Sequence, residues 1–288
     1  YLKNFQETSK VDRLVRMLES KGRTNFHFVL VHAKDPSLYP ANLLRNLAFS
    51  PVQTSMVFLL DVDLIPDVGF YAYLRKEYAT LWRLSSQSVF TIPAFQGING
   101  GASSEAEFPL DKPELMDLLS QKKIKPILSG ENEFWVAFSC LDYDSWYAKS
   151  EPYQFTYQWP CEPYLLGATA AIPRYDERFV HYGNDKAQHV LNMFYKQFSF
   201  MVLPEHFLVH WPHELAEWAD QKKRNEHIGE ILELTEQFKF ESGTAAGVNW
   251  HTGQKFTAGT YRVKNGKMIV WNGKEWIDKD SGQATDPL

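Results

Sequence analysis

An early part of the chain alternates between apolar and amphipathic segments, and this order restricts the fold more than any other feature. Two short apolar runs, residues 26–33 and 55–60, flank the helix-like segment YPANLLRNLAFS at residues 39–50. A strand, a helix and a second strand in this order form the crossover that joins parallel strands. Helices cover both faces of such sheets, so the pattern predicts an α/β protein with a mostly parallel central sheet flanked by helices.

The rest of the chain extends this pattern until about residue 245. Helices are expected over 8–20, 67–82, 111–123, 184–197 and 214–240, and strands over 88–95, 134–138, 164–172 and 198–203. Beyond that point apolar and polar residues alternate, and Asn265-Gly266 and Asn272-Gly273 are typical of tight hairpin turns. The sequence therefore predicts a main domain over residues 1–245 and a small β-hairpin appendage over 246–288.

The charge of the chain limits its partners. It carries 30 Lys and Arg against 35 Asp and Glu, a formal net charge of -5. Binding to nucleic acid requires an excess of basic side chains, so we expect no nucleic-acid partner. No stretch has the roughly 18 to 20 consecutive apolar residues that span a bilayer, and the first residues do not resemble a signal peptide. We expect a trimmed segment that makes no membrane contact, with an anchor removed.

Two cysteines, Cys140 and Cys161, are too few for a disulfide scaffold or a thiolate zinc site. They fit a single bridge in an oxidising compartment, or two buried thiols. The sequence does not distinguish these alternatives.

The apolar run at 55–60 leads into two acids, Asp61 and Asp63, in the stretch VFLLDVDLIP. Alternate strand residues share a face, so the two carboxylates are expected together while Val62 points into the core. Like charges this close favour a bound cation, and carboxylate oxygens suit Mn²⁺ or Mg²⁺. Ligands of open α/β sheets gather at this end of the strands. The pattern indicates a metal site for a nucleotide diphosphate; turn-capping acids before Pro66 are the alternative.

His210 follows the apolar run FLV and precedes Pro212, which prevents a helix. An imidazole among oxygen ligands favours Mn²⁺ over Mg²⁺. The alternative is a hydrogen-bonded histidine at the end of a strand.

Residues 159–190 are rich in acids, aromatic residues and glycine. Four acids in this segment compete for the role of general base: Glu162, Asp176, Glu177 and Asp185. Asp185 lies near the start of a predicted helix, where its carboxylate is equally suited to be a cap. The aromatic side chains nearby are suited to stack on sugar rings.

Several blocks in chain order, YPANLLRNLAFS, VFLLDVDLIP, CEPYLL, YDERFVHYGNDKAQHV and FLVHWPH, resemble glycosyltransferase family 49 over about residues 25–240. This family includes the dystroglycan-pathway β-1,4-glucuronyltransferase and the second catalytic domain of the LARGE enzymes. The resemblance implies a GT-A-type nucleotide-binding fold without its first strand or strands, a UDP-sugar donor, a Mn²⁺ ion, inversion at the anomeric carbon, a glycan acceptor and a Golgi lumen location.

Residue by residue, the resemblance implies that Asp61, Asp63 and His210 are the metal ligands. Three residues of the NLLRN block match positions expected to contact the donor: Asn42, Arg45 and Asn46. Asp185 matches a position at which the family carries Asn, and Glu162 of the CEPY block is the alternative base.

The resemblance therefore implies an inverting, Mn²⁺-dependent transferase that moves a sugar from a UDP-sugar to a glycan hydroxyl. The sugar stays open among glucuronate, xylose and N-acetylglucosamine, and several basic residues are candidate partners of a glucuronate carboxylate: Arg174, Arg178 and Lys186. One alternative is a catalytically silent carbohydrate-binding or scaffold protein. A nucleotidyltransferase is a second, although no glycine-rich, lysine-bearing phosphate loop is present.

Overall fold

The computed structural model describes residues 8–32, 35, 38–97, 108–127, 140–181, 183–211, 227–250, 252–256, 261–264 and 267–285. Contacts divide the chain into two compact units, each built from three segments. The first unit comprises Tyr1–Thr54, Arg174–Lys186 and Leu215–Leu234. The second comprises Ser55–Pro173, Ala187–Glu214 and Thr235–Leu288.

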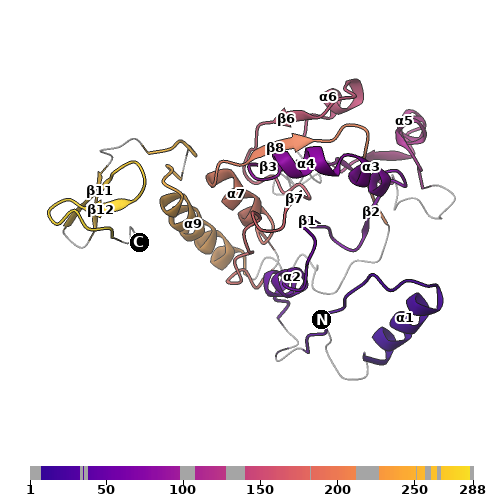
Figure 1. The fold of residues 1–288 in the computed structure, drawn as a ribbon, viewed down its shortest axis with the longest axis horizontal. Coiled ribbons are helices and arrows are strands. Elements are labelled where there is room, and N and C mark those ends of the chain that lie inside the picture. The colour runs from indigo at the N-terminus through magenta and orange to yellow at the C-terminus, as the bar shows by residue number, and fades with distance from the viewer. Residues whose placement is uncertain are drawn as a thin grey trace. The chain divides into compact units, whose positions relative to one another are not determined.

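Apart from α6 (Tyr143–Ala148), which the sequence analysis did not predict, the described helices follow the predicted order (Figure 1). They are α1 (Thr8–Ser20), α2 (Ala41–Phe49), α3 (Phe70–Lys76), α4 (Tyr78–Leu84), α5 (Lys112–Ser120), α6, α7 (Ala187–Tyr195) and α9 (Ile228–Ala245). Residues 214–226 of the helix expected over 214–240 lie outside the described residues. The cap expected for α5 is present, because Asp111 accepts a hydrogen bond from the Glu114 N–H at 2.9 Å. The helix expected over 67–82 is divided at Glu77 into α3 and α4. None of the described helices is both long and apolar enough to cross a bilayer.

The strands of the second unit form two mixed sheets and a small C-terminal sheet. They are β1 (Met56–Phe58), β2 (Leu64–Pro66), β3 (Ser88–Thr91), β4 (Ala94–Gly97), β5 (Ile124–Pro126), β6 (Tyr153–Phe155), β7 (Leu166–Ala168), β8 (Ser199–Val202), β9 (Leu208–His210), β10 (Tyr261–Lys264), β11 (Lys267–Trp271) and β12 (Trp276–Asp278). A five-stranded sheet has the order β1-β7-β3-β8-β6, and a four-stranded sheet the order β2-β9-β4-β5. The mixed α/β class expected from the sequence is confirmed.

Parallel pairing is a smaller share of these sheets than the sequence predicts. Among the described strands of the two mixed sheets, β3 pairs with β8 and β4 with β9 in parallel, and the other pairs are antiparallel. The crossover that suggested parallel pairing does not form, because residues 24–31 are neither helix nor strand, and Phe28, Val29 and Leu30 are exposed. An apolar run becomes a strand only where a neighbouring edge takes up its backbone hydrogen bonds, and no described strand pairs with this one.

The strand expected over 88–95 is found as two strands in different sheets. β3 ends at Thr91, β4 begins at Ala94, and Pro93 between them has no N–H to donate to a ladder. β8 and β9 run beside β3 and β4 in the same direction, so this double connection joins the two sheets. Figure 1 shows β3 and β8 side by side. The strand expected over 134–138 lies outside the described residues.

The core of the second unit is built around aromatic side chains. The Phe95 ring lies 5.2 Å from the Trp146 ring and 6.3 Å from the Phe207 ring, and all three side chains are fully buried. Burying side chains of this size contributes roughly 1.5 to 3 kcal/mol each. Close by in the sequence, Cys140 and Cys161 form a disulfide, which decides the alternative that the sequence leaves open.

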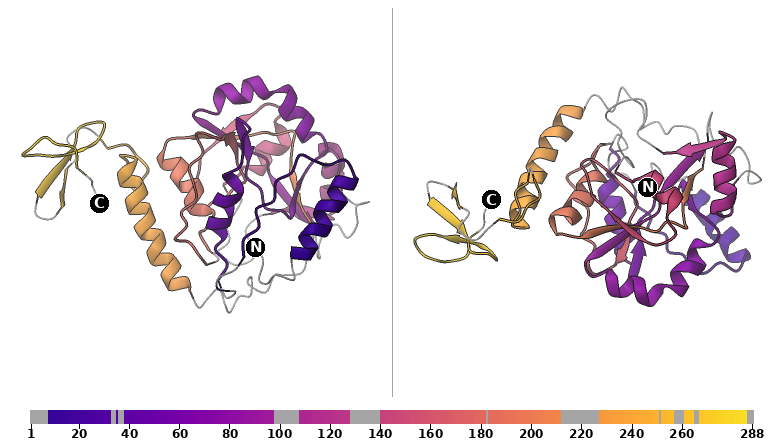
Figure 2. Two further views of the ribbon diagram at one scale, coloured as in Figure 1. Left: turned by 60° about the horizontal axis from the view of Figure 1, so that its bottom comes forward. Right: turned by 90° about the horizontal axis from the view of Figure 1, so that it is seen from above.

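The hairpins expected in the appendage are confirmed. β10, β11 and β12 form an antiparallel sheet, which follows α9 in the chain (Figure 2). Trp271 and Trp276 pack together with Ile269 in a small cluster of their own. Gly247, with φ of +70°, lies directly beneath the Trp271 ring, where a Cβ atom would collide with it. The domain boundary near residue 245 stays a prediction.

Candidate active site

Asp61 and Asp63 lie in a turn between β1 and β2 rather than in a strand. β1 ends at Phe58, and the Leu64 N–H donates to the Asp61 carbonyl oxygen at 3.2 Å, which closes the turn. The expectation that Val62 points into the core is wrong, because its side chain is fully exposed at 102%. Strand alternation does not extend through a turn, so it could not place these side chains.

The pairing of β1 with β7 places a partner beside Asp61. Phe58 is opposite Leu166 in this antiparallel pair, and the next residues run on toward Tyr164. The Tyr164 hydroxyl donates a hydrogen bond of 2.6 Å to Asp61 Oδ2. The sequence analysis did not identify Tyr164 as a partner of Asp61. The contact depends on the antiparallel pairing of β1 with β7, and no local pattern in the sequence indicates that pairing.

The pairing of β2 with β9 places His210 beside Asp63. Leu64 is opposite His210, and the Trp211 N–H donates to the Asp63 carbonyl oxygen at 2.7 Å. His210 Nε2 lies 3.5 Å from Asp63 Oδ2, and both side chains are about one-third exposed, at 32% and 31%. Two of the three predicted metal ligands are therefore adjacent and accessible.

This arrangement fits a divalent ion bound by oxygen and one nitrogen. Neighbouring ligands of one ion lie roughly 3 Å apart when each bond is about 2.1 Å long. The 3.5 Å between His210 Nε2 and Asp63 Oδ2 is close to that separation. Hydrogen bonds such as the one from Tyr164 to Asp61 orient metal-binding carboxylates. The binding of Mn²⁺ or Mg²⁺ at this turn stays a prediction.

Residues next to the same two strands form a buried hydrogen-bonded pair that sequence analysis did not identify, His206 and Asp67. His206 Nδ1 lies 3.0 Å from Asp67 Oδ2, and the N–H groups of Gly69 and Phe207 donate to the same carboxylate. Both side chains are at least nine-tenths buried. The pair fixes the chain where β2 ends and β9 begins, so its role is structural.

Glu162 follows the disulfide-bonded Cys161, which is buried. Burial, the charge of Glu162 and the neighbouring Tyr195 together raise the pKa of Tyr157 well above its usual value. The Tyr157 hydroxyl is buried and has no hydrogen-bond partner among the described residues. The candidate base Glu162 therefore lies close to a buried tyrosine hydroxyl.

Tyr157 also lines a cavity of about 310 Å³ in the second unit. Most of the lining side chains are aromatic, and a charged pair from α9 completes the wall: Tyr157, Trp159, Phe194, Trp250, Glu236 and Lys239. Lys239 Nζ lies 4.6 Å from the centre of the Trp159 ring and 2.6 Å from Glu236 Oε1. Flat aromatic faces beside a few polar groups are typical of a small-ligand site.

In the first unit, the NLLRN block forms a hydrogen-bonded network with residues 174–178. The Asn42 amide donates to the Asp176 carbonyl oxygen at 2.8 Å, and the Asn46 amide donates to the Tyr175 carbonyl oxygen at 2.9 Å. In return, the Tyr175 N–H donates to Asn46 Oδ1 at 2.9 Å. Both asparagines are buried. The network attaches this segment to α2, and donor contact by these residues stays a prediction.

Asp185 is part of the same network. Its Oδ2 accepts a 2.6 Å hydrogen bond from Arg45, and its Oδ1 accepts one of 3.2 Å from the Gly183 N–H. The residue is only 7% exposed. The guanidinium and this N–H thus occupy both carboxylate oxygens. The role of general base, for Asp185 or for Glu162, stays a prediction.

The arginines considered as partners of a sugar carboxylate are also engaged within the first unit. Arg174 donates to the Asn46 carbonyl oxygen at 2.9 Å and lies 4.6 Å above the Phe49 ring. Arg178 pairs with Asp176 at 2.6 Å. These contacts also occupy Asp176, which was one of the competing bases, and Glu177 accepts a hydrogen bond from Asn46.

A group of three side chains that sequence analysis did not single out also lies in the first unit: His181, His227 and Glu230. The spacing His227-x-x-Glu230 was an available signal, since residues three apart share a helix face. Burial and the nearby His227 lower the pKa of His181, which keeps its imidazole neutral at neutral pH.

Comparison with known proteins agrees with the resemblance of the motifs. LARGE1 of Danio rerio, a xylosyl- and glucuronyltransferase, is 32% identical over 198 residues, which cover 68% of this chain and 25% of that protein. LARGE2 of Mus musculus is 34% identical over 212 residues, covering 73% of this chain and 28% of that protein. The chain thus spans about a quarter of the length of these relatives.

A solved structure, S. aureus TarS 1-349 in complex with UDP, covers 92% of this chain and 85% of that one with 12% identity. Its TM-score of 0.35 is too low to support a conclusion. The sequence model of a family described as "Glycosyl-transferase for dystroglycan" matches residues 4–239, most of the chain. The acidic turn and its neighbours therefore lie within a matched domain, and the chain belongs to glycosyltransferase family 49.

Proposed function

We propose that this protein transfers a sugar from a UDP-sugar to a hydroxyl group of a glycan, with inversion at the anomeric carbon. The observation that carries the proposal is the adjacency of Asp63 and His210 on an accessible turn, within a chain of this family. The related LARGE proteins are named xylosyl- and glucuronyltransferases, which favours xylose or glucuronate over N-acetylglucosamine as the transferred sugar.

Asp61, Asp63 and His210 would hold the metal ion, which is Mn²⁺ in this proposal, with Mg²⁺ as the substitute. When bound, such an ion acts as a Lewis acid that stabilises negative charge on the departing diphosphate. The Tyr164 hydroxyl keeps the Asp61 carboxylate oriented through its 2.6 Å hydrogen bond. In this proposal the sugar forms no covalent bond to the protein at any stage of the reaction.

Glu162 would act as the general base. The acceptor hydroxyl oxygen forms the new bond to C1 of the sugar, the bond from C1 to the diphosphate oxygen breaks, and Glu162 takes the hydroxyl proton. Asp185 remains the alternative base, although Arg45 and the Gly183 N–H already bind its two oxygens.

The aromatic cavity is the proposed binding place for the acceptor glycan. Sugar rings present apolar C–H faces that pack on Trp159 and Trp250, while hydroxyl groups reach Glu236 and Lys239. The charge of Glu162 acts on Tyr157, which supports the proximity of this cavity to the proposed base.

A Golgi lumen location is proposed as well, from the resemblance to family 49. The disulfide between Cys140 and Cys161 supports an oxidising compartment, because such bridges are rare in reducing ones.

The experiment that tests the function combines binding with turnover. Calorimetry of the chain with UDP, with and without Mn²⁺, is expected to show metal-dependent binding. A screen of UDP-sugars with Mn²⁺ is then expected to release UDP from one sugar preferentially. UDP binding that is absent, or unaffected by the ion, would remove the transferase proposal. Glycan binding without any turnover would favour the silent carbohydrate-binding protein, for which the aromatic cavity is sufficient.

A further inference from the structure

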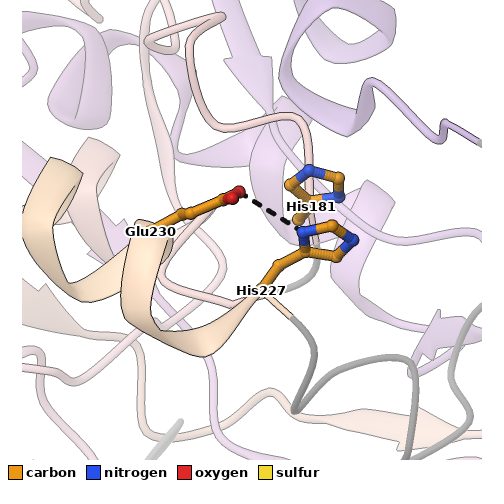
Figure 3. Close-up of side chains that lie close together, drawn as sticks. All are labelled: His181, His227 and Glu230. Carbon is orange, nitrogen blue, oxygen red and sulfur yellow. Dashed lines mark hydrogen bonds and ion pairs between the residues drawn. The ribbon is translucent and has the colours of Figure 1, made fainter.

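Three side chains with metal-binding groups meet in the first unit, outside the acidic turn (Figure 3). His181 comes from the segment before α7, His227 immediately precedes α9, and Glu230 lies in the first turn of that helix. The two imidazole rings are stacked, with centroids 3.7 Å apart and planes 3° from parallel. His227 Nδ1 lies 3.3 Å from Glu230 Oε2.

The nitrogen lone pairs of the stacked imidazoles lie in two parallel ring planes, so at least one ring has to turn before a nitrogen of each ring faces the same ion. A neutral imidazole keeps a lone pair on one ring nitrogen, and that is the form that binds metal ions. The carboxylate of Glu230 adds a negative charge to the same group.

The spacing of these groups is suitable for one small ion. One ligand atom from each residue lies within 4.8 Å of the others. A tetrahedral Zn²⁺ ion with bonds of about 2.0 to 2.1 Å has ligand atoms roughly 3.4 Å apart, so the group has to close by about 1.4 Å. The side chains of His227 and Glu230 are 39% and 73% exposed, so rotations about their own bonds can supply this movement.

We propose that His181, His227 and Glu230 form a second metal site, for Zn²⁺ or a similar transition metal, with a water molecule at the fourth position. Two nitrogens and one oxygen select a softer ion than the two carboxylates and one imidazole of the acidic turn. The proposed site is independent of the transferase reaction, so either proposal can fail without the other.

The consequence of binding at this site is local. His181 lies two residues before Gly183, whose N–H binds Asp185, and a Cβ atom at Gly183 would lie 3.5 Å from the Ile231 side chain. The segment before α7 and the first turns of α9 are thus already in contact within the first unit. A metal ion bound to residues of both segments would hold them together more firmly.

The test measures binding of Zn²⁺ alone to the full chain after removal of metals with a chelator. Competition with a chromophoric chelator is expected to show one equivalent of bound Zn²⁺ that is lost when His181 or His227 is replaced, beside any ion bound at the acidic turn. Co²⁺ substitution is expected to give the visible absorption of a tetrahedral site. His181→Asn and His227→Asn should each weaken Zn²⁺ binding at least tenfold. Glu230→Gln should weaken it by less than either histidine change.

A matched variant separates this site from other histidines. His27→Asn removes an exposed histidine of the same unit and should bind Zn²⁺ like the unmodified chain. Hydrogen exchange should show protection by Zn²⁺ in residues 181–185 and 227–234. The proposal is overturned if the unmodified chain takes up no Zn²⁺, or if His181→Asn and His227→Asn, confirmed as folded by circular dichroism, bind it as tightly as the unmodified chain.

Discussion

The acidic turn of the second unit and the NLLRN network of the first unit both contain polar residues that family resemblance assigns to the donor site, but the two are built differently. At the turn, Asp63 and His210 are about one-third exposed and approach each other at 3.5 Å. In the network, Asn42 and Asn46 are buried and hydrogen-bonded to the backbone of residues 175 and 176. Polar residues that bind a ligand must be reachable, whereas polar residues of a framework are buried and satisfied. The comparison predicts loss of activity from changes at the turn and loss of stability from changes in the network.

The largest effect is expected from Asp63→Asn. This change removes a negative charge from the proposed metal site, so transfer should fall at least roughly 10³-fold while the midpoint of thermal unfolding stays within a few degrees. Initial rates of UDP release measure the first quantity, and calorimetry the second. Asp12→Asn, at an exposed position of α1, is the control. Transfer at the unmodified rate in Asp63→Asn would exclude a metal site at this turn.

Asn46→Ala should have the next largest effect, on stability instead of activity. It leaves the Tyr175 N–H and carbonyl oxygen without their buried partner, which should cost about 2 to 4 kcal/mol in the free energy of unfolding. Urea unfolding measures this cost. If Asn46 also contacts the donor, the KM for the UDP-sugar will rise while stability changes little, and that result would contradict the framework interpretation.

Tyr164→Phe tests whether the turn depends on orientation of its ligands. Loss of the hydrogen bond to Asp61 should weaken Mn²⁺ binding about tenfold, the lower end for groups that orient metal ligands. Titration with Mn²⁺ measured by electron paramagnetic resonance gives the affinity. Tyr71→Phe is the matched control, because the Tyr71 side chain is 71% exposed. Equal Mn²⁺ affinities in both variants would show that Asp61 needs no such partner.

The smallest effect is expected from Arg178→Ala. Its ion pair with Asp176 lies at the rim of the network, with the arginine side chain 42% exposed, so its loss should cost no more than about 0.5 kcal/mol. Transfer rates should not change with any donor. A selective loss of glucuronate transfer would instead identify Arg178 as a partner of the sugar carboxylate.

Sequence patterns predicted those helices and hairpins that depend only on residues close together in the chain. The α5 helix begins where Asp111 and Pro113 predict it, and the hairpin of β11 and β12 turns within residues 272–275, which include Asn272-Gly273. The apolar run at 26–33 has the local pattern of a strand but no described strand beside it, so it remains without regular structure through residue 31. A strand depends on its neighbour, and its own residues cannot supply one.

The candidate site shows the same difference between what nearby residues determine and what tertiary contacts determine. The sequence by itself named the candidates for the chemistry, Asp61, Asp63, His210 and Glu162, because carboxylates and imidazoles are recognisable wherever they lie. Only the tertiary structure decided that Tyr164 reaches Asp61 and that Val62 faces solvent, because both depend on antiparallel pairing and a turn. The same holds for His181 and His227, which are 46 positions apart in the numbering and meet only through contacts within the first unit.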